Sequence, residues 1–291
     1  MTTSSPSSPD PTPFRPIVAG ALYPGIERGL AADVLATRAR KGQAYPVCTA
    51  HVAAGDGVVT DVLDVPTDTV NAHLDHLLET TTPTAVKIGV MGHPATVETI
   101  FDCAAEVDGP TILDVTVSGP SGEDVVGQRG IQAIQDHMDQ PDLVTVRRRD
   151  AELIAGMEIP SLDDAQVAAQ RIGQLGASHV LVRCGRIATH HFDLDSEPPN
   201  FAVDLLYDGD DFAVYEAPYL ELSDVHGASS ALLMALTDTL SRTDDILTDA
   251  LQEAKRYVTE ALRHTEQHDV DHVPHYFWAQ DGVPSPSTDP R

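Results

Sequence analysis

The chain has 291 residues, of which 45 are acidic and 18 are Lys or Arg, so its formal net charge is −27. A surface this acidic repels nucleic acid and anionic membranes, and we exclude both as partners. Only three of the basic residues are lysines. Because high salt screens the self-repulsion of such a surface, the composition predicts a halophilic, cytoplasmic protein.

This charge leads to a first testable prediction. Lowering KCl from molar to millimolar concentration should lower the melting temperature, because unscreened repulsion between the carboxylates grows as the ionic strength falls. NaCl at matched ionic strength should act like KCl, since screening does not depend on the cation's identity. An unchanged melting temperature would contradict the halophilic interpretation.

Short apolar runs alternate with helical patterns along the chain, which predicts parallel strands joined by crossover helices. In chain order, strands are expected at 16–20, 45–53, 58–65, 85–90, 111–117, 143–146 and 178–183. Helices are expected at 29–39, 67–79, 94–105, 127–138, 150–155, 162–175 and 250–263. Asp114 lies inside an apolar strand, where a carboxylate needs partners to offset its desolvation, so it is a candidate functional residue.

The stretch from Val203 to Leu236 organises the C-terminal third. Two β-prone runs, 203–207 and 212–215, flank the turn sequence DGDD, and a buried helix follows His226 and Gly227. Backbone N–H groups and serine hydroxyls at such a helix N-terminus favour an anion. A serine-capped core helix accounts for the same pattern.

Composition divides the chain into three parts. Residues 1–15 are expected to form a disordered leader, 16–263 one folded domain, and 264–291 a polar tail. His268, His272 and His275 are spaced like metal ligands on a helix, but Pro274 favours a frayed, solvated segment, and no metal is assigned there. Three cysteines without CxxC spacing predict free, mostly buried thiols, and no apolar run is long enough to span a membrane.

The segments VDLLYDG, EAP and VHGASSA resemble the C-terminal part of phosphomethylpyrimidine kinases, which belong to the ribokinase-like superfamily and are close to pyridoxal kinases. The resemblance extends over about residues 17–263 and implies a three-layer α/β/α domain with a mostly parallel central sheet. The family's loop usually reads T-H-G-T-G-C-T; its amides hold the transferring phosphoryl group and its Cys or Asp is the base. This implies catalytic roles for His226, Gly227 and Ser230, and a phosphate contact for Ser229.

Other segments extend the resemblance to the substrate. AGALYPGIERGLAADV resembles the family's first glycine-rich loop and helix, which implies substrate contacts for Gly20 and Asp33. CTAHV resembles a T-A-Q-N segment whose Gln reads the pyrimidine edge, and His51 stands in that place. VKIGVMG resembles V-K-T-G-M-L and keeps Lys87 and Gly89.

Three more segments imply nucleotide contacts. ILDVTV resembles V-V-D-P-V-M, which places Asp114 near Mg²⁺ and the phosphates. VTVRRRDAELIAG resembles V-T-P-N-x-x-E-A-E-x-L-x-G, with Arg147 in place of the Asn and Asp150 in place of the first Glu. VLVRCG resembles V-L-V-K-G-G-H, with Arg183 in place of the Lys. Three adjacent arginines, 147–149, fit an anionic ligand or a salt-bridge network equally well.

The resemblance implies phosphoryl transfer from ATP, with Mg²⁺, to hydroxymethylpyrimidine or its phosphate in thiamine biosynthesis, by an enzyme that forms a homodimer as related kinases do. Serine at position 230 has no basicity near neutral pH unless a neighbour such as His226 activates it. Two hypotheses follow: an active kinase with a relayed or dispensable base, or a degenerate paralogue that binds a pyrimidine or nucleotide as a sensor or partner. A pyridoxal-type kinase, with a pyridine substrate, is the second enzyme hypothesis.

Overall fold

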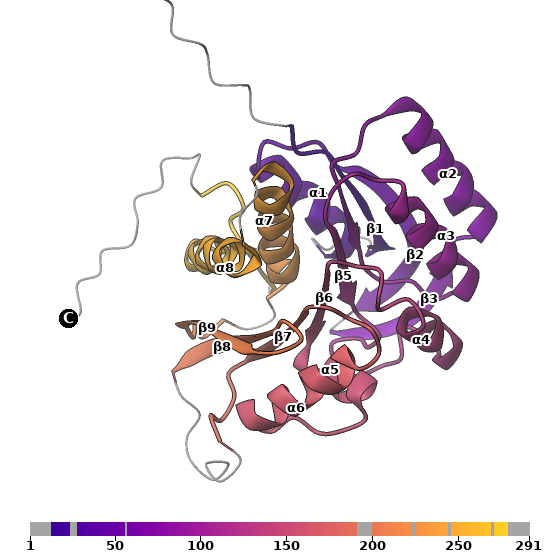
Figure 1. Ribbon diagram of the computed structural model, residues 1–291. Coiled ribbons are helices and arrows are strands. Elements are labelled where there is room, and N and C mark those ends of the chain that lie inside the picture. Colours follow the sequence, from indigo (N-terminus) through magenta and orange to yellow (C-terminus); the bar gives the residue numbers. More distant parts are fainter. Residues whose placement is uncertain are drawn as a thin grey trace, which may run out of the picture.

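The computed structural model describes residues 13–23, 28–55, 57–190, 200–222, 225–243, 246–268 and 271–278. Its centre is a single nine-stranded sheet with strand order β3-β2-β1-β4-β5-β6-β7-β8-β9 (Figure 1). The strands are β1 (Pro16–Leu22), β2 (Tyr45–Gly55), β3 (Val58–Asp64), β4 (Ala85–Ile88), β5 (Thr111–Val115), β6 (Leu143–Arg147), β7 (Val180–Gly185), β8 (Phe201–Tyr207) and β9 (Phe212–Pro218).

Six neighbouring strands, from β2 through β1, β4, β5 and β6 to β7, pair in parallel. Antiparallel strands close both ends: β3 pairs with β2, and β8 and β9 extend the sheet beyond β7. The central strands are buried on both faces, as their near-continuous apolar sequences require. The sheet is therefore mixed and mostly parallel, as predicted.

Helices cover both faces of the sheet and make three layers (Figure 1). One face carries α2 (Thr67–Thr80), α3 (Pro94–Ala105), α4 (Gln128–Gln135), α5 (Arg148–Ala155) and α6 (Leu162–Gly173). The other carries α1 (Gly29–Ala39), α7 (Ala228–Arg242) and α8 (Leu247–Arg263). Each side has its own apolar core, and the long apolar run of α7 fills much of the second one.

Most elements lie where periodicity placed them. Helices α1 and α3 have the predicted bounds, and the predicted DGDD turn joins β8 to β9. Asp208 closes this turn, because its Oδ1 accepts hydrogen bonds from the N–H groups of Asp210 (3.1 Å) and Asp211 (2.8 Å). The larger differences are at element ends: α4 ends at Gln135 instead of 138, α8 begins at Leu247 instead of 250, and β9 continues to Pro218 instead of 215.

The expectation of a frayed tail after Arg263 is wrong for its described part. A small hairpin of β10 (Glu266–His268) and β11 (Asp271–Val273) follows α8. Val273 and Tyr276 are buried in the core beside α7 and α8, and Trp278 packs against the same core. These apolar side chains explain the docking, which composition alone did not indicate. The predicted leader, residues 1–15, is wrong at its end, because Phe14 is buried in the core beside α1 and α7. Residues 1–12 lie outside the described residues.

The three cysteines are free thiols, as predicted, and Cys103 and Cys184 are buried. Burial raises the pKa of Cys184 to about 12, so its thiol stays protonated at neutral pH. Within the described ranges, every helix is too short or too polar to cross a membrane.

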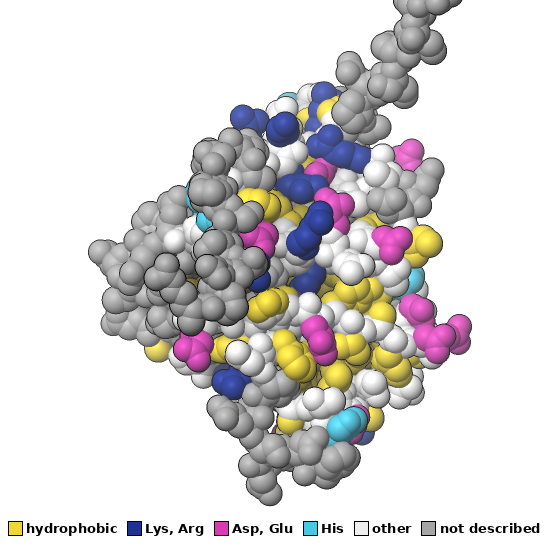
Figure 2. Space-filling view, turned by 90° about the vertical axis from the view of Figure 1, so that its left-hand side faces the viewer, with side chains coloured by type: hydrophobic (Ala, Val, Ile, Leu, Met, Phe, Trp, Pro, Cys, Tyr) yellow, Lys and Arg dark blue, Asp and Glu magenta, His cyan; other side chains and the backbone are white. Residues whose placement is uncertain are grey.

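Figure 2 shows the α8 side of the molecule, where basic and acidic side chains are interspersed rather than segregated. Within the fold, the buried Asp238 of α7 accepts a 2.8 Å hydrogen bond from Nε of Arg40 and a second bond from Nε of Arg242. Some of the few basic residues thus neutralise carboxylates inside the fold.

Candidate active site

The predicted site residues gather at the carboxyl ends of the parallel strands, where open α/β sheets bind their ligands. Lys87 lies on β4, Asp114 near the end of β5, Arg147 at the end of β6 and Arg183 on β7. The register sets Arg147 directly beside Arg183, so two guanidinium groups share one edge of the sheet. The N-termini of α1 and α7 complete the site.

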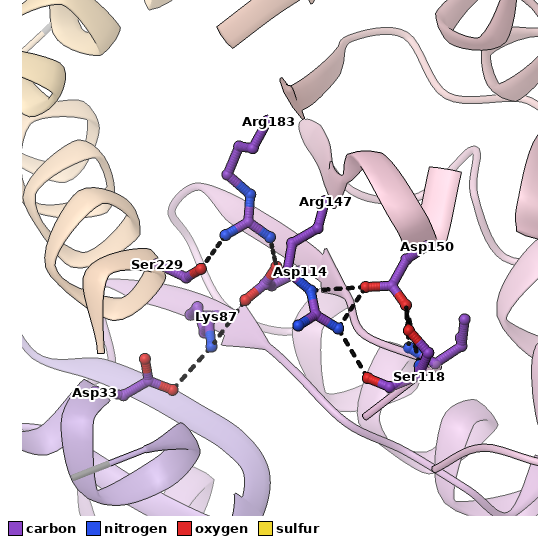
Figure 3. Close-up of polar contacts among 9 residues, drawn as sticks. Asp33, Lys87, Asp114, Ser118, Arg147, Asp150, Arg183 and Ser229 are labelled. Carbon is purple, nitrogen blue, oxygen red and sulfur yellow. Dashed lines mark hydrogen bonds and ion pairs between the residues drawn. The ribbon is translucent and has the colours of Figure 1, made fainter. Parts of the chain in front are cut away.

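A buried charge cluster lies at its centre (Figure 3). Nζ of Lys87 is 2.9 Å from Oδ2 of Asp33 and 3.6 Å from Oδ2 of Asp114. Burial alone would lower the pKa of Lys87, but the charges of Asp33 and Asp114 outweigh it and raise that pKa. Lys87 is therefore a fixed positive charge that holds a side chain of α1 to β5. The other carboxylate oxygen of Asp33, Oδ1, is buried and has no hydrogen-bond partner among the described residues.

Arg183 connects this cluster to helix α7. Its Nη2 lies 2.6 Å from Oδ1 of Asp114, and its Nη1 donates to the hydroxyl of Ser229. Burial would raise the pKa of Asp114, but Arg183, Lys87 and Arg147 together hold it below its ordinary value. The remaining guanidinium donor of Arg183, Nε, is buried and has no hydrogen-bond partner among the described residues.

Arg147 joins a second polar group. Its Nε (2.8 Å) and Nη2 (2.7 Å) contact Oδ2 of Asp150, and Nη2 also donates to the carbonyl oxygen of Ser118 (2.8 Å). Asp150 is fully buried, and its Oδ1 accepts from the Ser118 hydroxyl (2.6 Å) and the backbone N–H groups of Ser118 (3.0 Å) and Val117 (3.3 Å). This network fixes the guanidinium at the edge of the sheet.

Helix α7 begins at the site. Gly227 is its N-cap with φ of 80°, a left-handed conformation that favours glycine, and the first helical hydrogen bond runs from Ala231 N–H to Gly227 O. The N–H groups of the first turn, at positions 228–230, therefore have no acceptor within the helix. The docked tail supports this turn, because the hydroxyl of Tyr276 donates to Gly227 O at 3.3 Å.

One ring nitrogen of His226 has a partner other than Ser230. Its Nε2 contacts Nη2 of Arg28, and a guanidinium can only donate, so Nε2 must supply the lone pair. With this contact in place, Nε2 does not take a proton from Ser230. The suggested relay from His226 remains a prediction and would have to run through Nδ1.

Two cavities of about 340 and 350 Å³ flank the start of α7. Asp33, Lys87, Asp114 and the backbone of the α7 loop border the first; its other lining residues include Gly20, Tyr23, Arg28, Ser118, His226 and Ser230. The second lies between β8, β9 and α8 and is more apolar; it is lined by Arg183, Leu220, Leu222, Leu232, Val258 and Leu262, among others. Arg147 and Ser229 border both cavities, so the cavities meet at the helix N-terminus and the arginines.

The structure brings nearly all predicted site residues to these cavities; Asp150 lies behind Arg147 and does not line either. His51 lies apart from the site: it is exposed on β2, its Nε2 lies 3.9 Å from the Cys48 sulfur, and it lines neither cavity. Sequence reasoning missed Tyr23, Arg28, Ser118 and Tyr276. Of these, Arg28 could have been predicted, because it is a cation in the glycine-rich loop. Tyr276 could not, because it lies in a segment with the composition of a tail.

The carboxylates here do not fit a divalent cation held by the protein. Both oxygens of Asp150 are taken by the donors described above, and both oxygens of Asp114 face cations, Arg183 and Lys87. Among the described residues, no group of three or more His, Cys, Asp or Glu side chains could hold a metal ion. The indirect Mg²⁺ role that the resemblance implied for Asp114, through the phosphates, remains a prediction.

Comparison with known proteins gives a consistent result. The profile of the phosphomethylpyrimidine kinase family matches residues 27–275. A hydroxymethylpyrimidine/phosphomethylpyrimidine kinase of Aquifex aeolicus is 27% identical over 222 residues, covering 72% of this chain and 83% of that protein. One from Synechococcus elongatus is 30% identical over 197 residues, covering 67% and 71%.

Solved structures show the same fold. The pyridoxal kinase of Staphylococcus aureus in complex with AMP-PCP and pyridoxal has a TM-score of 0.78 at 20% identity, over 92% of this chain and 96% of that one. The phosphomethylpyrimidine kinase of Clostridium difficile has a TM-score of 0.69 at 24% identity, over 85% and 99%.

The fold, the paired cavities and these relatives define a phosphotransferase of ribokinase-like architecture. Within that class, the matched profile covers most of the chain. The chain belongs to the phosphomethylpyrimidine kinase family.

Proposed function

We propose that the protein transfers the terminal phosphoryl group of ATP to hydroxymethylpyrimidine or its monophosphate in thiamine biosynthesis. One observation carries the proposal. Two cavities of similar volume meet at the start of α7, and one contains an unpaired buried acceptor, Asp33 Oδ1, while a buried guanidinium with an unpaired donor, Arg183, lines the other. A substrate with an amino group suits the first cavity, and a phosphate chain suits the second.

The pyrimidine is placed in the first cavity. The free Oδ1 of Asp33 accepts a hydrogen bond from the exocyclic amino group, while Lys87 holds Oδ2 and fixes the orientation of the carboxylate. A buried charged acceptor left unpaired costs free energy, so a ligand that donates to it gains affinity. The hydroxymethyl group then points toward Ser230 and the start of α7.

The same carboxylate favours a pyrimidine over pyridoxal. Pyridoxal has no exocyclic amino group, and its phenolic oxygen, which readily ionises, would face the charged Asp33. The similarity to pyridoxal kinase structures, at about 20% identity, concerns the fold. A pyridoxal-type activity is therefore the second candidate.

The adenine base is placed in the second cavity, whose leucine and valine walls can cover a flat aromatic ring. Lys255 and Asp204 form a 2.5 Å ion pair in that wall. The phosphates extend from there to Arg183, Arg147 and the free N–H groups of α7. Magnesium enters as part of the substrate, MgATP.

The substrate hydroxyl attacks the terminal phosphorus, the bond to the bridging oxygen breaks, and ADP leaves. The hydroxyl proton passes to an oxygen of the transferred phosphoryl group. The helix N–H groups and the two arginines stabilise the charge that develops on the phosphoryl oxygens. Because the transition state is loose, positioning and charge stabilisation supply most of the catalysis, and a strong base is dispensable. Ser230, 4% exposed, is placed to orient the attacking hydroxyl.

Purified protein in molar KCl, supplied with ATP, Mg²⁺ and hydroxymethylpyrimidine, should form ADP and the phosphorylated pyrimidine in equal amounts. Ligand binding without any product would instead support the degenerate paralogue. Pyridoxal as the better substrate would support the second candidate.

A substitution of Asp33 tests how the substrate is read. Asp33→Asn should lower kcat/KM for hydroxymethylpyrimidine by about 10- to 100-fold, since a hydrogen bond to a charged group contributes about 1.5–3 kcal/mol. The Kd for ATP should stay nearly unchanged, because Asp33 does not line the second cavity. Equal losses for both ligands would contradict the assignment of the cavities.

We also propose a homodimer in a halophilic cytoplasm. Edge strand β3 supports self-association, because Leu63 (66%) and Val58 (41%) expose apolar surface along an unpaired sheet edge. The acidic composition supports the cellular setting.

A further inference from the structure

The phosphate end of the site contains carboxylates that cannot take another cation. Asp150 is fully buried, and five donor atoms surround its two oxygens: three on Oδ1 and two, both from Arg147, on Oδ2. A carboxylate has about four acceptor positions, so Asp150 is saturated. Binding a divalent cation there would first require displacing Arg147.

Both oxygens of Asp114 also face positively charged side chains. Arg183 lies 2.6 Å from its Oδ1, and Lys87 lies 3.6 Å from its Oδ2. A divalent cation at Asp114 would therefore sit against two fixed positive charges, and repulsion from them would offset its attraction to the single carboxylate.

Arg147 occupies the position between a carboxylate and the cavities. Its side chain is 37% exposed, it borders both cavities, and Figure 3 shows it between Asp150 and the cluster of Asp114 and Arg183. Nε and Nη2 are used by Asp150 and Ser118, whereas no hydrogen bond of Nη1 occurs among the described residues. The guanidinium thus presents charge and a donor toward the point where the cavities meet.

We infer that Arg147, together with Arg183, neutralises the nucleotide's phosphates, and that the protein itself holds no divalent cation at this position. In this arrangement Arg147 lies between the Asp150 carboxylate and the phosphate. Its fixed guanidinium takes the bridging place that a metal cation would otherwise have. Each guanidinium keeps one nitrogen for this task, Nη1 in Arg147 and Nε in Arg183, and a charge-assisted hydrogen bond from it to a phosphate oxygen is stronger than a neutral one. The inference rests on the proposed function, since it assumes that a nucleotide binds here.

The consequence is that nucleotide binding depends little on magnesium. Calorimetric titration of the full chain with ADP in molar KCl, in EDTA and in excess Mg²⁺, should give Kd values that differ by less than about threefold, because the arginines already supply the positive charge. A wild-type Kd at least about tenfold tighter with Mg²⁺ overturns the inference while leaving the proposed function in place. No ADP binding in either condition overturns both.

Arg147→Asn should make nucleotide binding depend on magnesium. Without the guanidinium, Oδ2 of Asp150 loses both of its donors and the carboxylate charge behind the phosphates is no longer neutralised. Metal-free ADP should then bind about tenfold or more weakly, and Mg²⁺ should restore much of that loss. Arg149→Asn is the matched control: Arg149 lies on the same helix, is exposed and lines neither cavity, so its Kd values should equal the wild type. If Arg147→Asn and Arg149→Asn behave alike, Arg147 does not have this role. Should Arg147→Asn fail to fold, the wild-type comparison in EDTA and Mg²⁺ decides the question alone.

Discussion

Replacing Lys87 with methionine should lower the free energy of unfolding by about 3–5 kcal/mol, the cost of removing one partner from a buried ion pair. Lys87 is 3% exposed and is the cation shared by Asp33 and Asp114. Methionine keeps most of the side-chain volume but leaves Asp33 without its ion-pair partner and Asp114 with Arg183 alone. Chemical denaturation in molar KCl measures the change.

The other two lysines provide a graded set of controls. Lys255 is 8% exposed and pairs with a single carboxylate, Asp204, so Lys255→Met should destabilise the protein less than Lys87→Met. Lys41 is exposed, and Lys41→Met should change the free energy of unfolding by less than about 0.5 kcal/mol. Equal effects at positions 87 and 41 would show that the buried cluster contributes nothing.

A double variant distinguishes loss of charge pairing from loss of packing. Adding Asp33→Asn to Lys87→Met removes the stranded carboxylate and should recover part of the stability. A double variant that is less stable than Lys87→Met would assign the effect to packing.

The pH dependence follows from the two pKa shifts. The raised pKa of Lys87 means that its stabilisation is fully present below the unfolded-state pKa of about 10.4 and is lost as pH rises through the higher folded value. The lowered pKa of Asp114 means that its stabilisation is present above about 3.9 and is lost as pH falls through the lower folded value. The stability difference between wild type and Lys87→Met should therefore be constant between about pH 7 and 9. It should shrink as pH falls through the folded pKa of Asp114, because protonation removes the charge that Lys87 pairs with.

Local patterns predicted the elements well because the central strands and the helices have clear hydrophobic periods. The same logic found Asp114, a lone carboxylate in an apolar strand. Lys87 is a comparable case, because it is a lone charge within the apolar strand AVKIGV and a buried charge needs a counter-ion. Its main partner, Asp33, is 54 residues away on α1, and only the packing of α1 against the sheet sets that distance.

Two features depended on geometry that local sequence does not encode. The pairing of β1 with β2 shifts register between Gly20 and Ala21, and a one-residue shift exchanges the faces of a strand, so the outward position of His51 could not be predicted. The tail's docking depends on a few side chains, Val273, Tyr276 and Trp278, within a polar segment. In both cases tertiary packing overrode the local pattern.

Ser230→Cys should raise the turnover number on the order of 10²-fold, the gain typical of a recovered general base. A serine hydroxyl is not ionised near neutral pH, whereas a thiol has a pKa of about 8.5 and a helix N-terminus favours its thiolate form. Ser230 lies in the first turn of α7 and lines the first cavity, so the thiolate would face the substrate hydroxyl. KM for the pyrimidine should change little, since the base acts mainly in the transition state.

The pH profile and a neighbouring variant separate a base from a structural effect. In the wild type, kcat should lack the acidic limb of a general base, because a serine hydroxyl is not ionised near neutral pH and Nε2 of His226 is bonded to Arg28. Ser230→Cys should gain such a limb, with kcat rising as pH passes through the thiol's pKa. Ser229→Cys is the matched control: its side chain contacts Arg183, and it should give neither the gain nor the limb. Binding of ATP and the pyrimidine without turnover, in the wild type and in Ser230→Cys alike, would reject the kinase and leave the degenerate paralogue.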